Sequence, residues 1–281
     1  MNRILLPLLL TLSISCATAP VAPPPAVATA MPQCTPGHSI LNATLWAQHS
    51  AEYRAIAMQT YVTASRALDA ALADPSWTGA VETTADPSRP PAVILDLDET
   101  AIDNTPFQTR VIRRGMTFDL PMWKEWTAEG RAPAIPGAAE FLAYAKSRGV
   151  TPFYISNRDQ DEMPGTRRNL EALGFPLSSE FETILLRGGR PEWVSDKASR
   201  RAHVAATHRI LLMIGDDLND FANAREAGAA DREKIIREHA SWWGTRWFML
   251  PNAMYGSWER AAIGRNGEPC EQVQKKIDLL H

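Results

Sequence analysis

The sequence predicts an α/β protein with a Rossmann-like, doubly wound and mostly parallel sheet that carries helices on both faces. Three observations favour this fold class: four short apolar runs, helical patterns between them, and clusters of polar residues directly after three of the runs. Continuous apolar runs are typical of strands buried on both faces of a parallel sheet. Strands that alternate with helices along the chain indicate a doubly wound sheet.

The four expected strands are runs of aliphatic and aromatic residues. They cover residues 92–95, 150–155, 209–214 and 247–250. In a sheet of this kind the carboxyl ends of the strands meet at one edge, and ligands bind there. The polar clusters after the first three strands are therefore expected to lie together.

Helices are expected between and around these strands. A long N-terminal helix is predicted over residues 39–74, where apolar residues recur at helical spacing. A second helix begins at Pro136 and ends at Gly149, and a third is predicted over residues 218–227. Residues 103–134 interrupt the alternation, and we expect them to form a small cap inserted over the sheet.

The N-terminus has the layout of a secretory signal peptide over residues 1–15, because Arg3 precedes an apolar run too short to span a bilayer. Two processing routes stay open. Cys16 becomes an acylated first residue if the chain is a lipoprotein, whereas Ala-Thr-Ala at 17–19 allows ordinary cleavage. The Ala/Pro-rich residues 16–38 have the composition of a tether, which favours a lipoprotein of the outer membrane over a periplasmic or secreted protein.

A single globular domain is expected over residues 39–270, followed by a C-terminal tail at 271–281. The chain has three cysteines, and acylation of Cys16 leaves Cys34 and Cys270 as an even pair near the two ends of the domain. Export places such a pair in an oxidising compartment. A disulfide between them is one alternative, and two free, inert thiols are the other.

The composition excludes several classes of protein. Of 281 residues, 45% are hydrophobic and 22% are charged, and 29 Lys+Arg against 32 Asp+Glu give a net charge of −3. These values are those of a globular protein, not of a disordered tail, a collagen-like fibre or a multi-span membrane protein. No basic surplus points to a nucleic-acid polymer as partner. The sequence leaves the oligomeric state open, with a homodimer as one option.

Five aspartates gather in the polar clusters that follow the strands. They are Asp96, Asp98, Asp216, Asp217 and Asp220. Carboxylates that converge at one edge repel one another unless a cation offsets their charge. Oxygen ligands without neighbouring His or Cys suit Mg²⁺, and no histidine spacing indicates zinc. The alternative is that these residues only form turns and helix caps after the strands.

The motifs, taken in order, resemble those of the haloacid-dehalogenase superfamily. The residues that carry the resemblance are Asp96-x-Asp98-x-Thr100, Ser156, Lys197 and Gly215-Asp216-Asp217. Further segments are similar to bacterial class C acid phosphatases, the lipoprotein e type that act as 5′-nucleotidases. These segments are Asp103-Asn104, residues 153–158 and residues 250–258, and the similarity covers roughly residues 40–260.

The resemblance implies a phosphoric monoester hydrolase, and the residue types allow that chemistry. Asp96 would attack phosphorus as an already ionised nucleophile and form an aspartyl-phosphate. Asp98 would protonate the leaving oxygen and then deprotonate water. Mg²⁺ would be held by Asp96, Asp216 and the backbone carbonyl of Asp98.

Other residues would bind phosphate or support the site. The expected phosphate ligands are Thr100, Ser156, Asn157 and Lys197. Asp217 and Asp220 would support the metal ligands without binding the ion themselves, and Asp220 would orient water molecules or Lys197. Arg158 is either a surface charge or a substrate contact, and the sequence does not separate the two.

The substrate is expected to be a small phosphomonoester, with 5′-nucleotides favoured. An aromatic clamp would stack on the nucleobase, as in the related lipoproteins. Its candidate members are Phe107, Trp123, Trp126 and Tyr255, although the tryptophans fit core packing equally well. The rival interpretations are a broad acid phosphatase without nucleotide preference and a non-catalytic surface binding or storage protein on the same fold.

Overall fold

The computed structural model describes residues 34–281, which form one compact unit. The expectations for the signal peptide, for Cys16 and for tether residues 16–33 lie outside the described residues. Within residues 34–281, no helix combines the length and the apolar character needed to cross a membrane.

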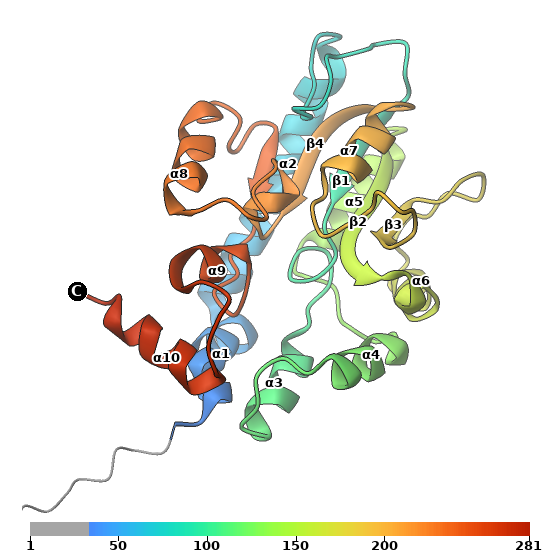
Figure 1. Cartoon of the computed structure of the whole chain (residues 1–281). Coiled ribbons are helices and arrows are strands. Elements are labelled where there is room, and N and C mark those ends of the chain that lie inside the picture. Colours follow the sequence, from blue (N-terminus) through green and yellow to red (C-terminus); the bar gives the residue numbers. More distant parts are fainter. Residues whose placement is uncertain (1–33) are drawn as a thin grey trace, which may run out of the picture. The chain divides into compact units, whose positions relative to one another are not determined.

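A five-stranded parallel sheet forms the centre of this unit (Figure 1). Its strands are β1 (Pro91–Leu95), β2 (Thr151–Asp159), β3 (Ile184–Arg187), β4 (Arg209–Gly215) and β5 (Trp247–Met249). They lie in the order β3-β2-β1-β4-β5, and every neighbouring pair is parallel. The predicted fold class is therefore confirmed. The prediction missed β3, a four-residue strand at one edge of the sheet.

A broken helix precedes the first strand of the sheet. It consists of η1 (Pro36–Ile40), α1 (Leu41–His49) and α2 (Ala51–Ala73). The single helix predicted over 39–74 is wrong at Ser50, which has extended backbone geometry and accepts a hydrogen bond from the Tyr53 N–H at 3.0 Å. Ser50 thus caps a new helix and ends the old one. The tether was also predicted to run too far, because η1 begins at Pro36.

Ten further elements surround the strands. They are α3 (Thr105–Arg113), α4 (Leu120–Glu129), α5 (Ala138–Ser147), η2 (Gln160–Glu162), α6 (Met163–Ala172), α7 (Ala198–Ala205), η3 (Leu218–Asp220), α8 (Ala229–Glu238), α9 (Ser257–Ile263) and α10 (Pro269–Asp278). The helix predicted over 218–227 is wrong beyond η3. The predicted tail at 271–281 is mostly helix α10, which begins with a capping box at Glu268. Helices α3 and α4 form the expected insertion and lie beyond the carboxyl ends of the strands.

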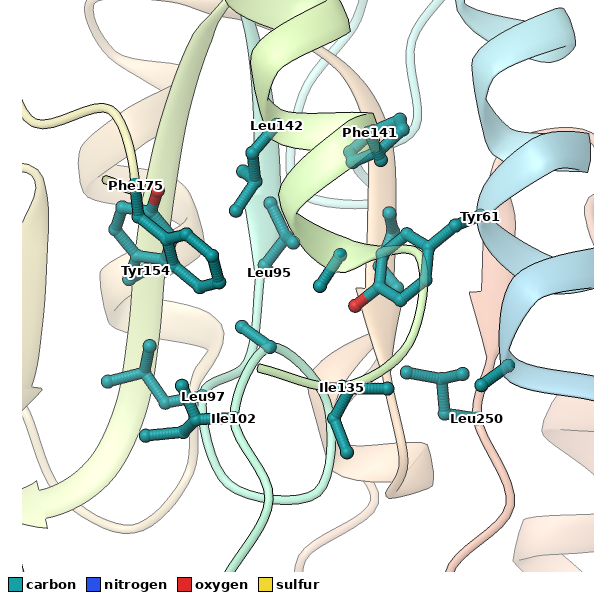
Figure 2. Packing of buried hydrophobic residues seen from close by; sticks show 14 of the residues in the cluster. Tyr61, Leu95, Leu97, Ile102, Ile135, Phe141, Leu142, Tyr154, Phe175 and Leu250 are labelled. Atoms are coloured by element: carbon teal, nitrogen blue, oxygen red, sulfur yellow. The ribbon is translucent and has the colours of Figure 1, made fainter. Parts of the chain in front are cut away.

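Side chains of the strands alternate between two cores, one on each face of the sheet. Val93 and Leu95 of β1 face the core shared with α2 and α5, whereas Ala92 and Ile94 face the core that contains Trp247. In Figure 2 the ring of Tyr61 from α2 lies beside Phe141 of α5, with ring centroids 5.7 Å apart. The Tyr61 hydroxyl donates to the backbone carbonyl of Thr100 at 2.8 Å. The core thus reaches directly to the loop that follows β1.

Candidate active site

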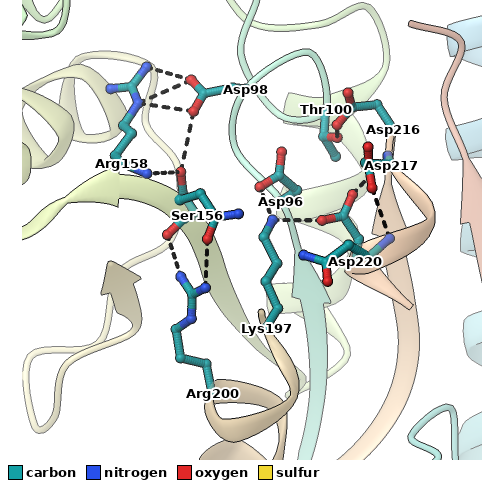
Figure 3. A network of polar contacts seen from close by, with 12 residues as sticks. Asp96, Asp98, Thr100, Ser156, Arg158, Lys197, Arg200, Asp216, Asp217 and Asp220 are labelled. Carbon is teal, nitrogen blue, oxygen red and sulfur yellow. Dashed lines mark hydrogen bonds and ion pairs between the residues drawn. The ribbon is translucent and has the colours of Figure 1, made fainter. Parts of the chain in front are cut away.

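The loop after β1 places Asp96 at the centre of the site (Figure 3). Asp96 is buried, and its carboxylate accepts a hydrogen bond from the ammonium of Lys197, at the start of α7. The same ammonium donates to Asp220 at 2.6 Å. Burial raises the pKa of Asp96 to about 7, although the charge of Lys197 opposes that rise. The sequence analysis expected Asp96 to be fully ionised. With the pKa at this value, full ionisation at neutral pH requires a further positive charge near Asp96, in addition to that of Lys197.

Asp216, at the end of β4, completes an acidic group with Asp96 and Asp220. One carboxylate oxygen of each residue lies within 4.8 Å of the other two. Asp216 accepts hydrogen bonds from Thr100 Oγ1 at 3.0 Å and from Asn252 Nδ2 at 2.8 Å. Burial and the neighbouring carboxylates raise the pKa of Asp216 well above its ordinary value. These three side chains are thus brought together at a cost in electrostatic free energy.

Asp98 lies apart from that acidic group and has its own partners (Figure 3). Arg158 donates to it from Nη2 at 2.8 Å and from Nε at 3.0 Å, and Asn104 Nδ2 donates at 2.8 Å. Ser156 Oγ donates to the second oxygen of Asp98 at 3.2 Å. The Asp98 carboxylate is therefore held in one orientation, two residues from Asp96.

Arg158 is not a surface charge. Its side chain is buried, with 2% of the residue exposed. Nη1 donates to Thr166 Oγ1 at 3.0 Å, and the guanidinium lies 5.4 Å from the centre of the Trp123 ring. Arg158 therefore fixes the positions of Asp98, Thr166 and Trp123 relative to one another. It also lines the pocket.

A second buried arginine, Arg200 of α7, supports the loop after β2. It donates to the carbonyl of Ser156 and, at 2.7 Å, to Oδ1 of Asn157. The Asn157 amide nitrogen donates to the Ser195 carbonyl at 3.0 Å. Burial lowers the pKa of Arg200 to about 10, which still leaves it charged at neutral pH. The prediction missed this residue, because nothing local in the sequence separates it from neighbouring Arg201.

Asp217 is bound by the segment that starts α9. It accepts hydrogen bonds from the Ser257 hydroxyl and backbone N–H, and from the Asn219 N–H at 2.9 Å. Burial raises its pKa, but these hydrogen bonds outweigh burial and lower it overall. Gly215 is required beside it, because a Cβ there would lie 2.3 Å from an oxygen of Asp220. In the turn after β4, the Asp220 side chain thus packs directly against the backbone of Gly215.

A pocket of about 670 Å³ opens over these residues. Asp96, Asp98, Lys197 and Asp216 line it at the polar end. The aromatic residues Trp123, Tyr255 and Phe118 also line it, together with the fully buried Phe107; Phe118 is 61% exposed and was missed by the prediction. The rings of Phe107 and Trp123 meet edge to face, with centroids 5.0 Å apart. The pocket is therefore charged at one end and aromatic at the other.

Four of the residues predicted to contact the substrate are bound by other protein groups in the structure. The Thr100 hydroxyl is buried and bound to Asp216, and that of Ser156 is buried and bound to Asp98, so neither faces a phosphate. Asn157 lines the pocket, and its side chain is held by Arg200 and Ser195. Trp126 is 3% exposed, does not line the pocket and donates from Nε1 to Asn104 Oδ1 at 2.8 Å. Thr100, Ser156 and Trp126 therefore support neighbouring protein groups, whereas the role of Asn157 in phosphate binding stays a prediction.

Comparison with known proteins decides the family. The family described as HAD superfamily, subfamily IIIB (acid phosphatase), matches residues 10–258. The chain belongs to this acid phosphatase family. The class C acid phosphatase from Bacillus anthracis is 34% identical, and the alignment covers 88% of this chain and 98% of that one with a TM-score of 0.78. A second structure of that enzyme, with tungstate bound, gives the same values.

Two plant proteins are more distant relatives of this chain. The stem 31 kDa glycoprotein of Glycine max is 26% identical over 166 residues, which are 58% of each chain. Acid phosphatase 1 of Solanum lycopersicum is 26% identical over 167 residues, 58% of this chain and 57% of its own. The matched segment thus spans less than two thirds of these curated relatives.

The acidic group of this phosphatase family member fits a divalent cation. Asp96, Asp216 and Asp220 offer only oxygen atoms, which hard cations such as Mg²⁺ prefer. Burial raises the pKa of each of these three carboxyl groups, and the charges of neighbouring carboxylates add to the rise. Lys197 alone offsets one of the three charges. A cation at this position would therefore relieve the repulsion and leave Asp96 ionised.

Proposed function

We propose that this protein hydrolyses small phosphate monoesters, with 5′-nucleotides as preferred substrates, by way of an aspartyl-phosphate. The observation that carries the proposal is the arrangement of Asp96, Asp98 and Lys197 at the charged end of an aromatic pocket. Two carboxylates with separate partners allow separate roles. A bound Mg²⁺ would offset the charge that gathers on the transferring phosphoryl group.

The first step forms a covalent intermediate. An oxygen of Asp96 attacks phosphorus, and the bond between phosphorus and the leaving oxygen breaks. Asp98, protonated at that moment, gives its proton to the leaving oxygen, so the alcohol departs neutral. Lys197 donates hydrogen bonds as a point charge to the phosphoryl oxygens while it remains anchored on Asp220.

The second step releases phosphate. Water attacks phosphorus, Asp98 takes up the proton that the water loses, and the bond from phosphorus to Asp96 breaks. Both carboxylates then return to their starting states. Arg158 and Ser156 hold the Asp98 carboxylate in one orientation, because each donates a hydrogen bond to it.

The nucleotide preference rests on the aromatic end of the pocket. Phe118, Trp123 and Tyr255 line this part of the pocket, and the buried ring of Phe107 packs against Phe118 and Trp123. Base stacking on aromatic side chains is worth about 1–3 kcal/mol per base. A phosphatase without nucleotide preference is the second candidate, since the charged end is the same for any monoester.

The decisive experiment measures phosphate release from a 5′-nucleotide, a 3′-nucleotide and a sugar phosphate, each with Mg²⁺ and with EDTA. Asp96→Asn is expected to abolish turnover, a loss of at least about 10⁴-fold, while the far-UV circular dichroism spectrum is unchanged. Asp69→Asn serves as the matched control, because it is an isosteric change at an exposed position of α2. This variant should retain full activity.

The outcomes separate the three interpretations. Release from the 5′-nucleotide alone supports the proposal, and equal rates for all three substrates indicate a broad phosphatase. No release from folded, Mg²⁺-loaded protein would leave a binding or storage role. Wild-type rates in Asp96→Asn would contradict the nucleophile assignment.

We further propose that the protein acts outside the cytoplasm, anchored by a lipid on Cys16. This rests on the sequence of residues 1–15 and on the Ala/Pro-rich segment that follows. Incorporation of labelled palmitate into the wild-type chain but not into Cys16→Ser would support the anchor. Equal labelling of both chains would contradict it.

A further inference from the structure

Two segments from opposite ends of the chain lie side by side next to the pocket. They are η1 (Pro36–Ile40) and α10 (Pro269–Asp278), and a disulfide between Cys34 and Cys270 joins them across 236 residues of sequence. The two Cα atoms are 5.9 Å apart. In Figure 1 the red helix α10 lies next to the blue start of the described chain.

Both segments line the pocket. The residues that do so are Pro36, Gly37, Ser39, Ile40, Pro269, Gln272, Val273 and Lys276. None of them belongs to the sheet or to the loops that carry the aspartates. We name these eight residues the terminal wall.

The terminal wall abuts the cap insertion. A Cβ on Gly37 would lie 2.6 Å from the backbone carbonyl oxygen of Met116, in the connection between α3 and α4. Met116 and Phe118 of that connection line the pocket too. η1 therefore lies between α10 and the cap, and it joins the two sides of the aromatic end of the pocket.

Apolar packing contributes little to holding the terminal wall in place. Helix α10 has no buried residue, and in η1 only Gly37 is buried. Non-covalent support for α10 includes the ion pair between Lys276 and Glu259 of α9, both partly exposed. Ion pairs of that kind contribute little to stability. The disulfide is therefore the strongest tie between α10 and the remainder of the wall.

We propose that the Cys34–Cys270 disulfide fixes the terminal wall as a contact surface for the leaving group, so that the pocket favours nucleoside-sized leaving groups over small ones. The proposal rests on the proposed function and extends it to residues outside the motifs. The charged end of the pocket is built from β1, β4 and the start of α7, so loss of the disulfide leaves the reacting groups in place.

The test compares the full chain with a Cys34→Ser/Cys270→Ser double variant on two substrates. One is adenosine 5′-monophosphate, and the other is p-nitrophenyl phosphate, whose leaving group is a single ring. The variant is expected to raise KM for the nucleotide about tenfold, the size of effect that one lost pocket contact produces. For p-nitrophenyl phosphate, kcat and KM are expected to stay within about twofold.

A second variant keeps the disulfide and changes the wall alone. Val273→Trp adds bulk on a helix without buried residues, so the fold is preserved. It is expected to raise KM for the nucleotide while leaving p-nitrophenyl phosphate unaffected. Val273 is matched by Gln274→Trp on the exposed side of the same helix, which should change neither substrate.

Binding of adenosine, measured by calorimetry, separates this proposal from the proposed function. If the wild-type protein binds adenosine and both wall variants bind it more weakly, the terminal wall is supported even where no monoester is hydrolysed. Equal affinity in all proteins, or no adenosine binding by the wild type, would overturn it. So would equal losses on both substrates, because they indicate general destabilisation.

Discussion

Arg158 holds the orientation of Asp98 together with Ser156 and Asn104, and its guanidinium contacts several neighbours at once. It reaches both oxygens of Asp98, the hydroxyl of Thr166 and the face of Trp123. A planar fork of donors suits this arrangement, whereas the single ammonium of a lysine does not. In the proposed mechanism Arg158 is thus a positioning residue, since it would act through Asp98 on the leaving oxygen.

Replacement of Arg158 by Gln is expected to lower kcat about 10–100-fold with little change in KM, because proton transfer by Asp98 is impaired more than binding. Arg158→Lys should restore part of the loss, as it keeps the charge but not the fork. Steady-state kinetics on p-nitrophenyl phosphate measure both. Arg209→Lys, a buried arginine at the opposite end of β4, is the control. A rise in KM at unchanged kcat would instead make Arg158 a substrate contact.

Residue chemistry was the most predictable feature of the site, and partner choice the least. The aspartates and Lys197 stand in recognisable positions of the sequence, but Thr100 and Ser156 were expected to face phosphate. Their hydroxyls are bound to carboxylates instead. Which partner a hydroxyl selects depends on segments 116 and 58 residues away along the chain, and local sequence does not specify it.

At the scale of elements, the cap depends on an ion pair between its two helices. Arg110 of α3 donates to both oxygens of Glu129, the last residue of α4, at 2.6 and 2.8 Å. Hydrogen bonds from Arg110, assisted by Arg131, lower the pKa of Glu129 to about 2 against the opposing effect of burial. The pair thereby ties together the two helices that present the aromatic residues.

Glu129→Gln is expected to lower the free energy of unfolding at pH 7 by about 0.5–1 kcal/mol, a modest value because both side chains are partly exposed. A lowered pKa in the folded state means that the stabilisation is full above the ordinary glutamate pKa and is lost as pH falls toward 2. Urea denaturation at pH 7 and at pH 2.5 measures this. Glu125→Gln on the same helix is the control. A difference that persists unchanged at pH 2.5 would show that the ion pair is not its source.

Prediction of the elements succeeded for four of the five strands and failed at one edge strand and at several helix boundaries. The predicted strands at 92–95, 150–155 and 209–214 coincide with β1, β2 and β4 within a few residues. Strand β3 was missed, and the helix predicted over 39–74 is broken at Ser50. A single capping residue breaks the helix, and strand β3 has only four residues. A periodicity averaged over a longer window detects neither feature.

At the scale of the whole molecule, a cation is expected to stabilise the fold because it binds only the folded arrangement of the acidic group. Mg²⁺ at one hundred times its dissociation constant adds about 2.7 kcal/mol, a rise in Tm of roughly 5–10 °C. Thermal denaturation with Mg²⁺ and with EDTA measures the effect. Asp216→Asn should make Tm insensitive to Mg²⁺.

The effect of Mg²⁺ on Tm is expected to be larger at pH 7 than at pH 5. Burial raises the pKa of Asp96 to about 7 and that of Asp216 above its ordinary value, so both bind more protons in the folded than in the unfolded state. Without the cation, stability therefore falls as pH rises from about 4 toward 7. The cation reverses this loss by favouring the ionised carboxylates. An equal gain in Tm at both pH values would contradict this account.

The sequence by itself determined the fold class, the order of the motifs and the presence of five aspartates at one edge of a parallel sheet. These follow from local patterns, since an apolar run defines a strand and the residue after it lies at the strand end. The tertiary structure decided which groups meet: Lys197 with Asp96 across 101 residues, Arg158 with Asp98 across 60, and Cys34 with Cys270 across 236. Such contacts arise from the packing of helices and strands onto one another, which no local pattern encodes.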